Sequence, residues 1–442
     1  MRRVIYALLR RFSVLDRWLR ERLTPMGWLA LGAAGAAAAG GIDLNQTLTA
    51  QAFTFLAALL LLAFLASRAF RAQVDVARQL PRYATAGEDF VYRVTVTNRG
   101  TATLFGATVA ERFRDPRPGF EEWRATREPG EQRRNWFDRE IGYFRWRWLI
   151  ERRIPESPTE VALPPLAPGQ SHSLRLGFLP RRRGRLELSG VNLARADPLG
   201  LMKGIARVSL HARVVALPKR YRIPALALPG ARKFQQGGVS LSASIGDSEE
   251  FLSLRDYRPG DPLQRVHWKS FARTGKPIVK EYQDEFFERH ALVLDTGTRR
   301  GEDAAFEEAV AVAASFVYTI DTLECLLDLL FVGGTVKTYT SGRGQSHAEQ
   351  MLEVLAGVAP SRPEEFGALA AAVLARRTTL SSVIAVLLAW DDTRREFVTR
   401  ARAGGLEVRA LLICDPGETP PAEPGLLVLR PGAIDSGLAR LQ

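Results

Sequence analysis

The sequence predicts a multidomain chain made of an apolar helical hairpin, a β-sandwich and an α/β domain with a mostly parallel, doubly wound sheet. Three observations lead to this prediction: two long apolar runs near the start, a period of two from residue 74 to about 217, and alternating strands and helices after residue 290. We divide the 442 residues into 1–71, 72–220, 221–289 and 290–442.

The hairpin is predicted from the runs Met26–Ile42 and Leu48–Ala66, which are about 17 and about 19 residues long. Arginines crowd before the first run and after the second, whereas the connecting loop has none. Because basic residues stay on the cytoplasmic side, we expect two transmembrane helices in the cytoplasmic membrane, with both chain ends and all soluble parts in the cytoplasm.

Residues 72–220 are predicted to form the sandwich. Phe90, Tyr92, Val94 and Val96 alternate with more polar residues, and the same pattern returns in several later runs separated by Gly/Pro turns. Short alternating strands of this kind favour an immunoglobulin-like architecture, which binds or spaces more often than it catalyses.

An aromatic and basic insertion, residues 112–158, interrupts this pattern. Within it, Asn135–Ile154 carries six aromatic side chains among five arginines. Rings at the head-group level with guanidinium groups on phosphate are typical of an interfacial membrane segment. The alternative is that these aromatics cover an exposed edge of the sandwich core.

The stretch 248–282 concentrates charged residues around one predicted turn at 258–261. Pro259 presets φ and Gly260 supplies a positive φ, so a tight bend is expected, followed by a short helix and a strand at Ile278–Tyr282. These charges form either an internal ion-pair network or a docking surface. We expect Arg255, Arg258 and Lys269 to bind protein, and Asp261 and Trp268 to be structural.

A third interpretation of this stretch is hydrolytic. Ser270 and His267 lie three residues apart on one predicted helix and could approach each other. The sequence shows neither an oxyanion hole nor a strained nucleophile turn beside them, which disfavours this interpretation.

The stretch resembles the bacterial family known as domain of unknown function 58. Eleven positions carry the resemblance, in order and spacing: Glu250, Phe251, Leu254, Arg255, Tyr257, Gly260, Asp261, Arg265, Trp268, Ala272 and Arg273. The upstream run Arg181–Leu201, with its Arg-Gly and Asp-Pro-Leu-Gly-Leu elements, also resembles the family. The resemblance implies association with a MoxR-type AAA+ ATPase.

The last part, 290–442, alternates strands with helices, which predicts a mostly parallel sheet covered on both faces. Asp295 and Asp391 follow strands and should meet at the crevice where such sheets bind ligands. The pattern is similar to the von Willebrand factor A fold, whose metal site adds two hydroxyl residues at the second and fourth positions after the first aspartate. Gly297 and Arg299 stand there instead, so we expect a degenerate site in which the Arg299 guanidinium lies beside Asp295 and no metal binds.

The composition argues against a nucleic-acid partner, a disulfide framework and a Cys/His metal site. The net charge of +13 comes from 54 arginines and only 7 lysines, a bias that a GC-rich genome also produces. No nucleic-acid-binding motif accompanies the charge, so we expect no nucleic-acid partner. Cys325 and Cys414 lie in apolar runs and exclude a disulfide framework, and no Cys/His cluster has metal spacing.

Together these observations favour a membrane-anchored scaffold that is not an enzyme, needs no cofactor and binds proteins. The alternative is an enzyme or a metal-dependent ligand receptor acting at the Asp295/Asp391 crevice, with Arg255 and Arg265 holding an anion. A nucleophile beside a base would favour the enzyme, and the sequence shows none at that crevice.

Overall fold

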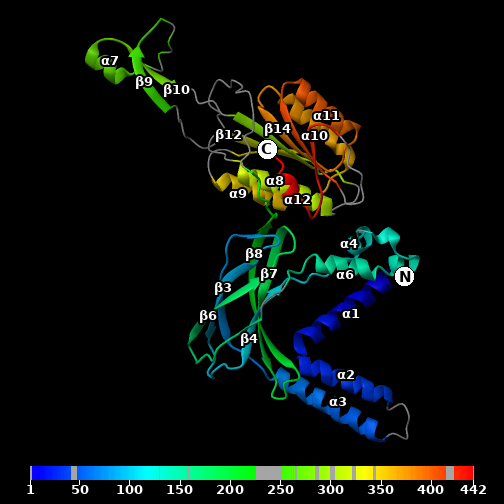
Figure 1. Cartoon of the computed structure of the whole chain (residues 1–442). Coiled ribbons are helices and arrows are strands. Elements are labelled where there is room, and N and C mark those ends of the chain that lie inside the picture. The colour runs from blue at the N-terminus through cyan, green and yellow to red at the C-terminus, as the bar shows by residue number, and fades with distance from the viewer. Residues whose placement is uncertain are drawn as a thin grey trace. The chain divides into compact units, whose positions relative to one another are not determined.

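The computed structural model (Figure 1) describes residues 2–40, 47–128, 130–156, 160–224, 250–259, 261, 263, 266–283, 288–298, 304–320, 325–341, 345–414 and 423–441. The chain divides into two compact units, Met1–Lys219 with Glu353–Gly357, and Arg220–Leu352 with Val358–Gln442.

Three helices open the first unit: α1 (Arg2–Arg22), α2 (Pro25–Gly40) and α3 (Thr47–Arg68). The apolar segment of α3, Leu48–Arg68, is long and apolar enough to cross a membrane. The 16 residues of α2 rise about 24 Å, which is short of the roughly 30 Å hydrocarbon core. Within the described residues, one helix of sufficient length and apolarity is therefore found where two spans are predicted, and α2 packs along it.

The junction between α1 and α2 is fixed to the turn after Asp197. The Thr24 hydroxyl donates to the carbonyl of Gly200 at 2.6 Å and accepts from the Gly27 amide at 3.0 Å. A Cβ on Gly27 would lie 2.1 Å from the carbonyl oxygen of Leu201, so only glycine permits this approach. The Asp-Pro-Leu-Gly-Leu element thus anchors the helical hairpin to the sheet.

Two sheets form the sandwich. One has the order β1-β3-β6, all antiparallel, and the other has the order β2-β8-β7-β4-β5. Their strands are β1 (Val74–Gln79), β2 (Tyr83–Thr85), β3 (Phe90–Asn98), β4 (Ala107–Phe113), β5 (Glu160–Ala162), β6 (Ser171–Phe178), β7 (Gly184–Ala196) and β8 (Lys203–Leu217). Alternate residues of both sheets share one apolar core, which includes Val94, Leu176, Val109 and Leu193. The predicted β-sandwich is confirmed.

A buried ionic network crosses this core. Arg78 of β1 donates to Glu111 of β4 at 2.9 Å, and the Tyr92 hydroxyl donates to the other carboxylate oxygen at 2.5 Å. The side chains of Arg78 and Glu111 are only 4% and 1% exposed. Burial raises the pKa of Glu111, although Tyr92 and Arg78 oppose that rise.

The insertion folds into three short helices, α4 (Phe120–Ala125), α5 (Trp136–Ile141) and α6 (Tyr143–Glu151). Trp123 and Trp146 are buried against Ile5, Tyr6 and Leu9 of α1. The expectation that the aromatics of this segment face the membrane is therefore wrong for Trp146. Trp136 and Phe137 of α5 do stay exposed, at 72% and 55%.

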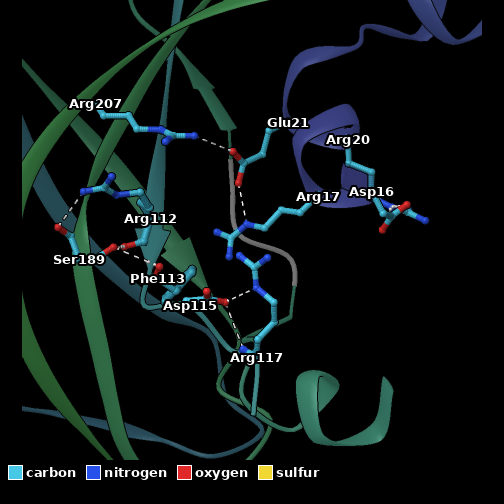
Figure 2. Close-up of polar contacts among 10 residues, drawn as sticks. All are labelled: Asp16, Arg17, Arg20, Glu21, Arg112, Phe113, Asp115, Arg117, Ser189 and Arg207. Carbon is cyan, nitrogen blue, oxygen red and sulfur yellow. Dashed lines mark hydrogen bonds and ion pairs between the residues drawn. The ribbon is translucent and has the colours of Figure 1, made fainter. Parts of the chain in front are cut away.

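The far half of α1 lies against the sandwich through charged groups. Figure 2 shows Glu21 between Arg17 of the same helix, at 2.8 Å, and Arg207 of β8, at 3.3 Å. Leu23 packs with Met202 and Ala63 just beyond. Sequence reasoning predicts no helix here, yet α1 contacts the insertion, the sandwich and α3.

In the second unit, β9 (Glu250–Asp256) pairs antiparallel with β10 (Ile278–Gln283), and α7 (Trp268–Thr274) lies between them along the chain. The predicted strand at Ile278–Tyr282 is confirmed, whereas β9 is not predicted. The apolar residues Leu263, Val266 and Phe271 recur at helical spacing and predict a helix that begins near Leu263. Helix α7 instead begins at Trp268, five residues later.

The α/β part has one six-stranded sheet of order β13-β12-β11-β14-β15-β16, in which only the β12/β13 pair is antiparallel. Its strands are β11 (Glu288–Leu294), β12 (Cys325–Gly333), β13 (Thr335–Ser341), β14 (Ser382–Leu387), β15 (Glu407–Ile413) and β16 (Leu426–Leu429). Its helices are α8 (Ala304–Thr319), α9 (Gln345–Ala356), α10 (Phe366–Ala375), α11 (Asp392–Ala403) and α12 (Ile434–Leu438).

Helices cover both faces of this sheet. Helices α10 and α11 pack on the face that carries Val293 and Ala385, while α8 packs against β11, β14 and β15 from the other side (Figure 1). The predicted mostly parallel, doubly wound sheet is confirmed. Its order reverses between β11 and β14, so the ends of these two strands form the switch point where such sheets bind ligands.

Candidate functional site

The turn after β9 is held by one aspartate. The Arg255 guanidinium donates two hydrogen bonds to Asp261, at 2.7 and 2.8 Å, and the Arg258 amide donates a third at 2.8 Å. The Asp261 amide in turn donates to the Arg258 carbonyl at 3.1 Å, which closes the predicted bend. Gly260 lies outside the described residues.

These donors stabilise the ionised carboxylate. The hydrogen bonds from Arg255 and from the Arg258 amide lower the pKa of Asp261 to about 2. Arg255 and Asp261 are 32% and 15% exposed, so this is a half-buried local pair within the hairpin. Arg255, predicted to bind a partner, therefore also orders the turn.

The surface around α7 mixes exposed aromatic, apolar and basic side chains. Trp268 is 60% exposed and Leu263 is 66% exposed, and the Trp268 ring contacts Phe271 edge to face with centroids 6.0 Å apart. Trp268 is expected to be structural because a residue on the inner face of the short helix would be buried, and this expectation of burial is wrong. Arg258, Lys269 and Arg273 are also exposed, and the last two lie on α7 with Trp268.

The other residues of the family hallmark are placed only in part. Tyr257 is half-buried, and its amide donates to the carbonyl of Pro277 at 3.0 Å. Glu250 begins β9, but its side chain lies outside the described residues, as does Arg265.

His267 and Ser270 do meet. The Ser270 hydroxyl lies 2.6 Å from His267 Nδ1, at the first turn of α7. No carboxylate among the described residues hydrogen-bonds this histidine, so the contact is a local one at the helix start. It lacks the third member that orients the base in a hydrolytic triad.

Asp295 follows β11 at the switch point, and every lone-pair direction of its carboxylate is engaged. Oδ1 accepts from the Gly297 amide at 2.9 Å and from Arg394 Nη2 at 3.0 Å. Oδ2 accepts from Arg394 Nε at 2.7 Å and from the Leu388 amide at 3.1 Å. Both side chains are 1% exposed, so a buried guanidinium lies where a metal ion would have to bind.

Arg394 is positioned by the start of α11. Asp391 caps this helix by accepting from the Arg394 amide at 3.0 Å, and it also accepts from Arg394 Nη1 at 2.5 Å. A cation in the first turn opposes the helix dipole. Burial alone would lower the pKa of Arg394, but hydrogen bonds and charge from Asp295 and Asp391 outweigh burial and raise it.

Gly297 permits the close packing around this pair. A Cβ there would lie 2.9 Å from Pro363 Cα and 3.0 Å from Arg394 Nη2. Glycine at a hydroxyl-ligand position is thus what makes room for the guanidinium. Among the residues that the structure describes, no group of three His, Cys, Asp or Glu side chains is placed to hold a metal ion.

The expected partner of Asp295, Arg299, lies outside the described residues, and the guanidinium found there belongs to Arg394. A signal for Arg394 is present in the sequence. Arg394 lies at helical spacing from Phe397, Val398 and Ala401, and these four residues form the buried face of α11. A basic residue on an apolar helix face needs a carboxylate partner, and Asp295 supplies it.

Comparisons with known proteins agree with the resemblance. Residues 253–432 match the model of the family described as "Protein of unknown function DUF58". The chain is 28% identical over 176 residues to uncharacterized protein YeaD of Bacillus subtilis, covering 39% of this chain and 42% of that protein. It is 30% identical over 215 residues to uncharacterized protein Rv1480 of Mycobacterium tuberculosis, covering 46% and 66%. The matches thus span less than two thirds of either relative.

Solved structures resemble the chain only weakly. A CARDB domain of PF1109 from Pyrococcus furiosus has a TM-score of 0.15 at 12% identity, covering 31% of this chain and 94% of that one. A PapD-like domain of human CEP192 has a TM-score of 0.18 at 14% identity, covering 33% and 87%. Scores this low carry no argument, so the sandwich stands on its own strand order and shared core.

Proposed function

Starting from the DUF58 match of residues 253–432, we propose that the chain is a membrane-anchored scaffold, not an enzyme, that binds another protein through the surface around α7. The resemblance implies a MoxR-type AAA+ ATPase as that partner. In this proposal the sandwich is immunoglobulin-like and the α/β part is a von Willebrand factor A-like domain that works without a metal.

One observation carries the proposal: the switch-point carboxylate is already paired. Asp295 forms four hydrogen bonds, two of them with the buried guanidinium of Arg394. A cation would have to displace this guanidinium and would find glycine at one hydroxyl-ligand position. The pair therefore supports a structural role for this crevice and shifts the search for function to the exposed surface.

The α7 surface has the composition of an interface. Trp268 and Phe271 are exposed aromatic side chains, and tryptophan and arginine are the residue types enriched at interaction hot spots. Arg258, Lys269 and Arg273 are exposed in the same hairpin. Asp261 is paired with Arg255, so the exposed described charges include these three basic residues against Asp256. Their balance is positive and fits an acidic patch on the partner.

The helices support the membrane part of the proposal. On α1 the apolar residues Val4, Leu8, Phe12 and Leu15 recur at helical spacing and are 53–66% exposed. Arg3, Arg10 and Arg11 lie among them. An exposed apolar stripe beside arginines suits the head-group region of an anionic bilayer, and α3 is long and apolar enough to insert into it.

In the alternative function, the chain is an enzyme or a metal-dependent receptor at the Asp295/Asp391 crevice, and Arg255 and Arg265 bind an anion. Arg255 is engaged by Asp261 at 2.7 Å, and Arg265 lies outside the described residues. Asp391 is 49% exposed, but it caps α11 and pairs with Arg394. These pairings favour the scaffold over the enzyme.

The test is recovery of partners from bacterial membranes with the full-length chain, followed by mass spectrometry. The triple variant Arg255→Ala/Arg258→Ala/Lys269→Ala should lose the ATPase. Because Arg255 also orders the turn, Trp268→Ala serves as a second variant that leaves the Asp261 pair intact. A matched control removes three basic residues elsewhere, Arg93, Arg175 and Lys337. Retained ATPase recovery by the triple variant at wild-type stability would remove the docking proposal.

A further inference from the structure

A basic cavity in the first unit lies outside every site considered above. Its volume is about 530 Å³, and it lies between the end of β4, the end of α6 and the turn that leads into β7. This volume is in the range of small-molecule sites, roughly 300–1,000 Å³. Every lining segment is continuous in the structure, from residue 113 to 119, 152 to 155 and 181 to 187.

Eight arginines line the cavity. Two come from the segment after β4, two from the end of α6, and four from the Arg-Arg-Arg-Gly-Arg run at 181–185. Only two carboxylates, Asp115 and Glu187, lie among them. This run is part of the family resemblance, and neither the sandwich core nor the α7 surface uses it.

The nearby carboxylates are already engaged by arginines. Asp115 accepts from Arg117 Nε at 2.7 Å, and Glu187 pairs with Arg114 at 2.5 Å and with Arg213 at 4.0 Å. The hydrogen bonds and charge of Arg117, with the charge of Arg17, outweigh burial and lower the pKa of Asp115. Two further carboxylates outside the lining, Glu122 and Glu156, pair with Arg153 and Arg181. Eight lining arginines against these four carboxylates leave a formal excess of four positive charges, although Arg183 also donates to the Leu355 carbonyl at 3.1 Å.

One buried donor of the lining has no acceptor. Arg117 Nη1 is buried without a hydrogen-bond partner within the described part of the chain, as is Arg112 Nε, which belongs to the residue just before the lining begins. Figure 2 shows the neighbourhood, with Arg117 against Asp115 and with Arg112 donating through Nη2 to the Ser189 carbonyl. Burial and the charge of Arg207 lower the pKa of Arg112. Unpaired buried donors destabilise a protein unless a ligand accepts from them.

We propose that this cavity binds a small anion that carries at least two phosphate groups. The planar fork of a guanidinium matches phosphate bidentately. A single carboxylate or phosphate would neutralise only part of the excess and fill only part of the volume. Gly184, whose φ is +125°, lets the 181–185 run turn into β7 with arginines on both sides of the bend.

Two sources offer this chemistry, a soluble polyphosphate and a diphosphate lipid head group. The full-length chain in detergent micelles is titrated with inorganic tripolyphosphate by calorimetry. The chain is also mixed with phosphatidylcholine vesicles with and without cardiolipin. Saturable tripolyphosphate binding that weakens with salt supports the soluble source. Cardiolipin-dependent vesicle binding without tripolyphosphate binding supports the lipid source.

The variant Arg117→Gln/Arg185→Gln should weaken whichever binding is found by about tenfold or more, because charge-assisted contacts are lost. The matched control Arg93→Gln/Arg175→Gln removes two exposed arginines of the same sandwich, and its binding should stay at the wild-type level. Arg117→Lys keeps the charge but loses the planar fork of the guanidinium, so its affinity should lie between that of the double variant and that of the control. No saturable binding in either arm, or equal losses in the double variant and its control at unchanged melting temperature, overturns the proposal.

Discussion

Replacing Arg394 by methionine tests the switch-point pair most directly. The change removes three side-chain hydrogen bonds, two to Asp295 and one to Asp391, and keeps most of the side-chain volume. Asp295 would remain buried with only the amides of Gly297 and Leu388 as donors. Breaking a buried pair by removing one partner costs about 3–5 kcal/mol.

This loss of stability should lower the midpoint of one thermal unfolding transition, that of the second unit. For a unit of this size each kcal/mol shifts the midpoint by about 2–4 °C, so the transition of the second unit should fall by roughly 6–20 °C. Scanning calorimetry of the full-length chain measures this shift. The double variant Asp295→Asn/Arg394→Met removes both charges and should recover much of the loss.

The neighbouring Arg395→Met is the matched control. Its side chain is 47% exposed and pairs with Asp392 and Glu423, so the change should stay within about 0.5 kcal/mol of wild type. If Arg394→Met melts like Arg395→Met, the reasoning that Asp295 depends on this guanidinium is refuted.

Three further predictions concern metal, protonation and topology. Titration of the full-length chain with Mg²⁺ should give no saturable site below millimolar concentration, because Arg394 holds Asp295; a micromolar isotherm abolished by Asp295→Ala would contradict this. Asp261 should titrate near pH 2 by carboxyl NMR, and its depressed pKa means that its stabilising contribution is present above about pH 4 and is lost as the pH falls through about 2. In Arg255→Gln its midpoint should move up toward about 3.9, and an unchanged midpoint would remove Arg255 as the cause. A reporter fused after Gln442 should behave as cytoplasmic and one inserted near Asn45 as external, so export of the C-terminal reporter would overturn the proposed topology.

The sandwich and the α/β sheet can be predicted from the sequence because the burial pattern of each strand is visible in its own residues. Phe90 to Val96 alternate because one face of β3 is core, and Val383 to Leu387 form an apolar run because β14 is covered on both faces. Strands of both kinds can therefore be recognised from a few consecutive residues.

The missed elements depend on distant partners. Helix α1 has arginines through its whole length, and its inner face becomes recognisable only beside Trp123 and Trp146. Strand β9 carries charges and is specified by its pairing with β10. A guanidinium beside Asp295 is predicted from the sequence, but it is assigned to Arg299, which is near in sequence. The observed partner, Arg394, lies 99 residues away, and its place on the apolar face of α11 marks it as buried without indicating which carboxylate it meets.

The attachments of α1 also constrain how the chain is made. Its inner face packs on residues 123–150 and 201–202, which leave the ribosome more than a hundred residues later. At about 5–20 residues per second, synthesis up to Met202 takes roughly 10–40 s, and α1 lacks the partners at 123–150 for the first part of that interval and those at 201–202 for all of it. An amphipathic, arginine-rich helix in that interval has the lipid surface as its available apolar phase. Membrane engagement of α1 would then precede folding of the sandwich, and Met202 would close the contact only after the strands of the sandwich that precede it have been synthesised.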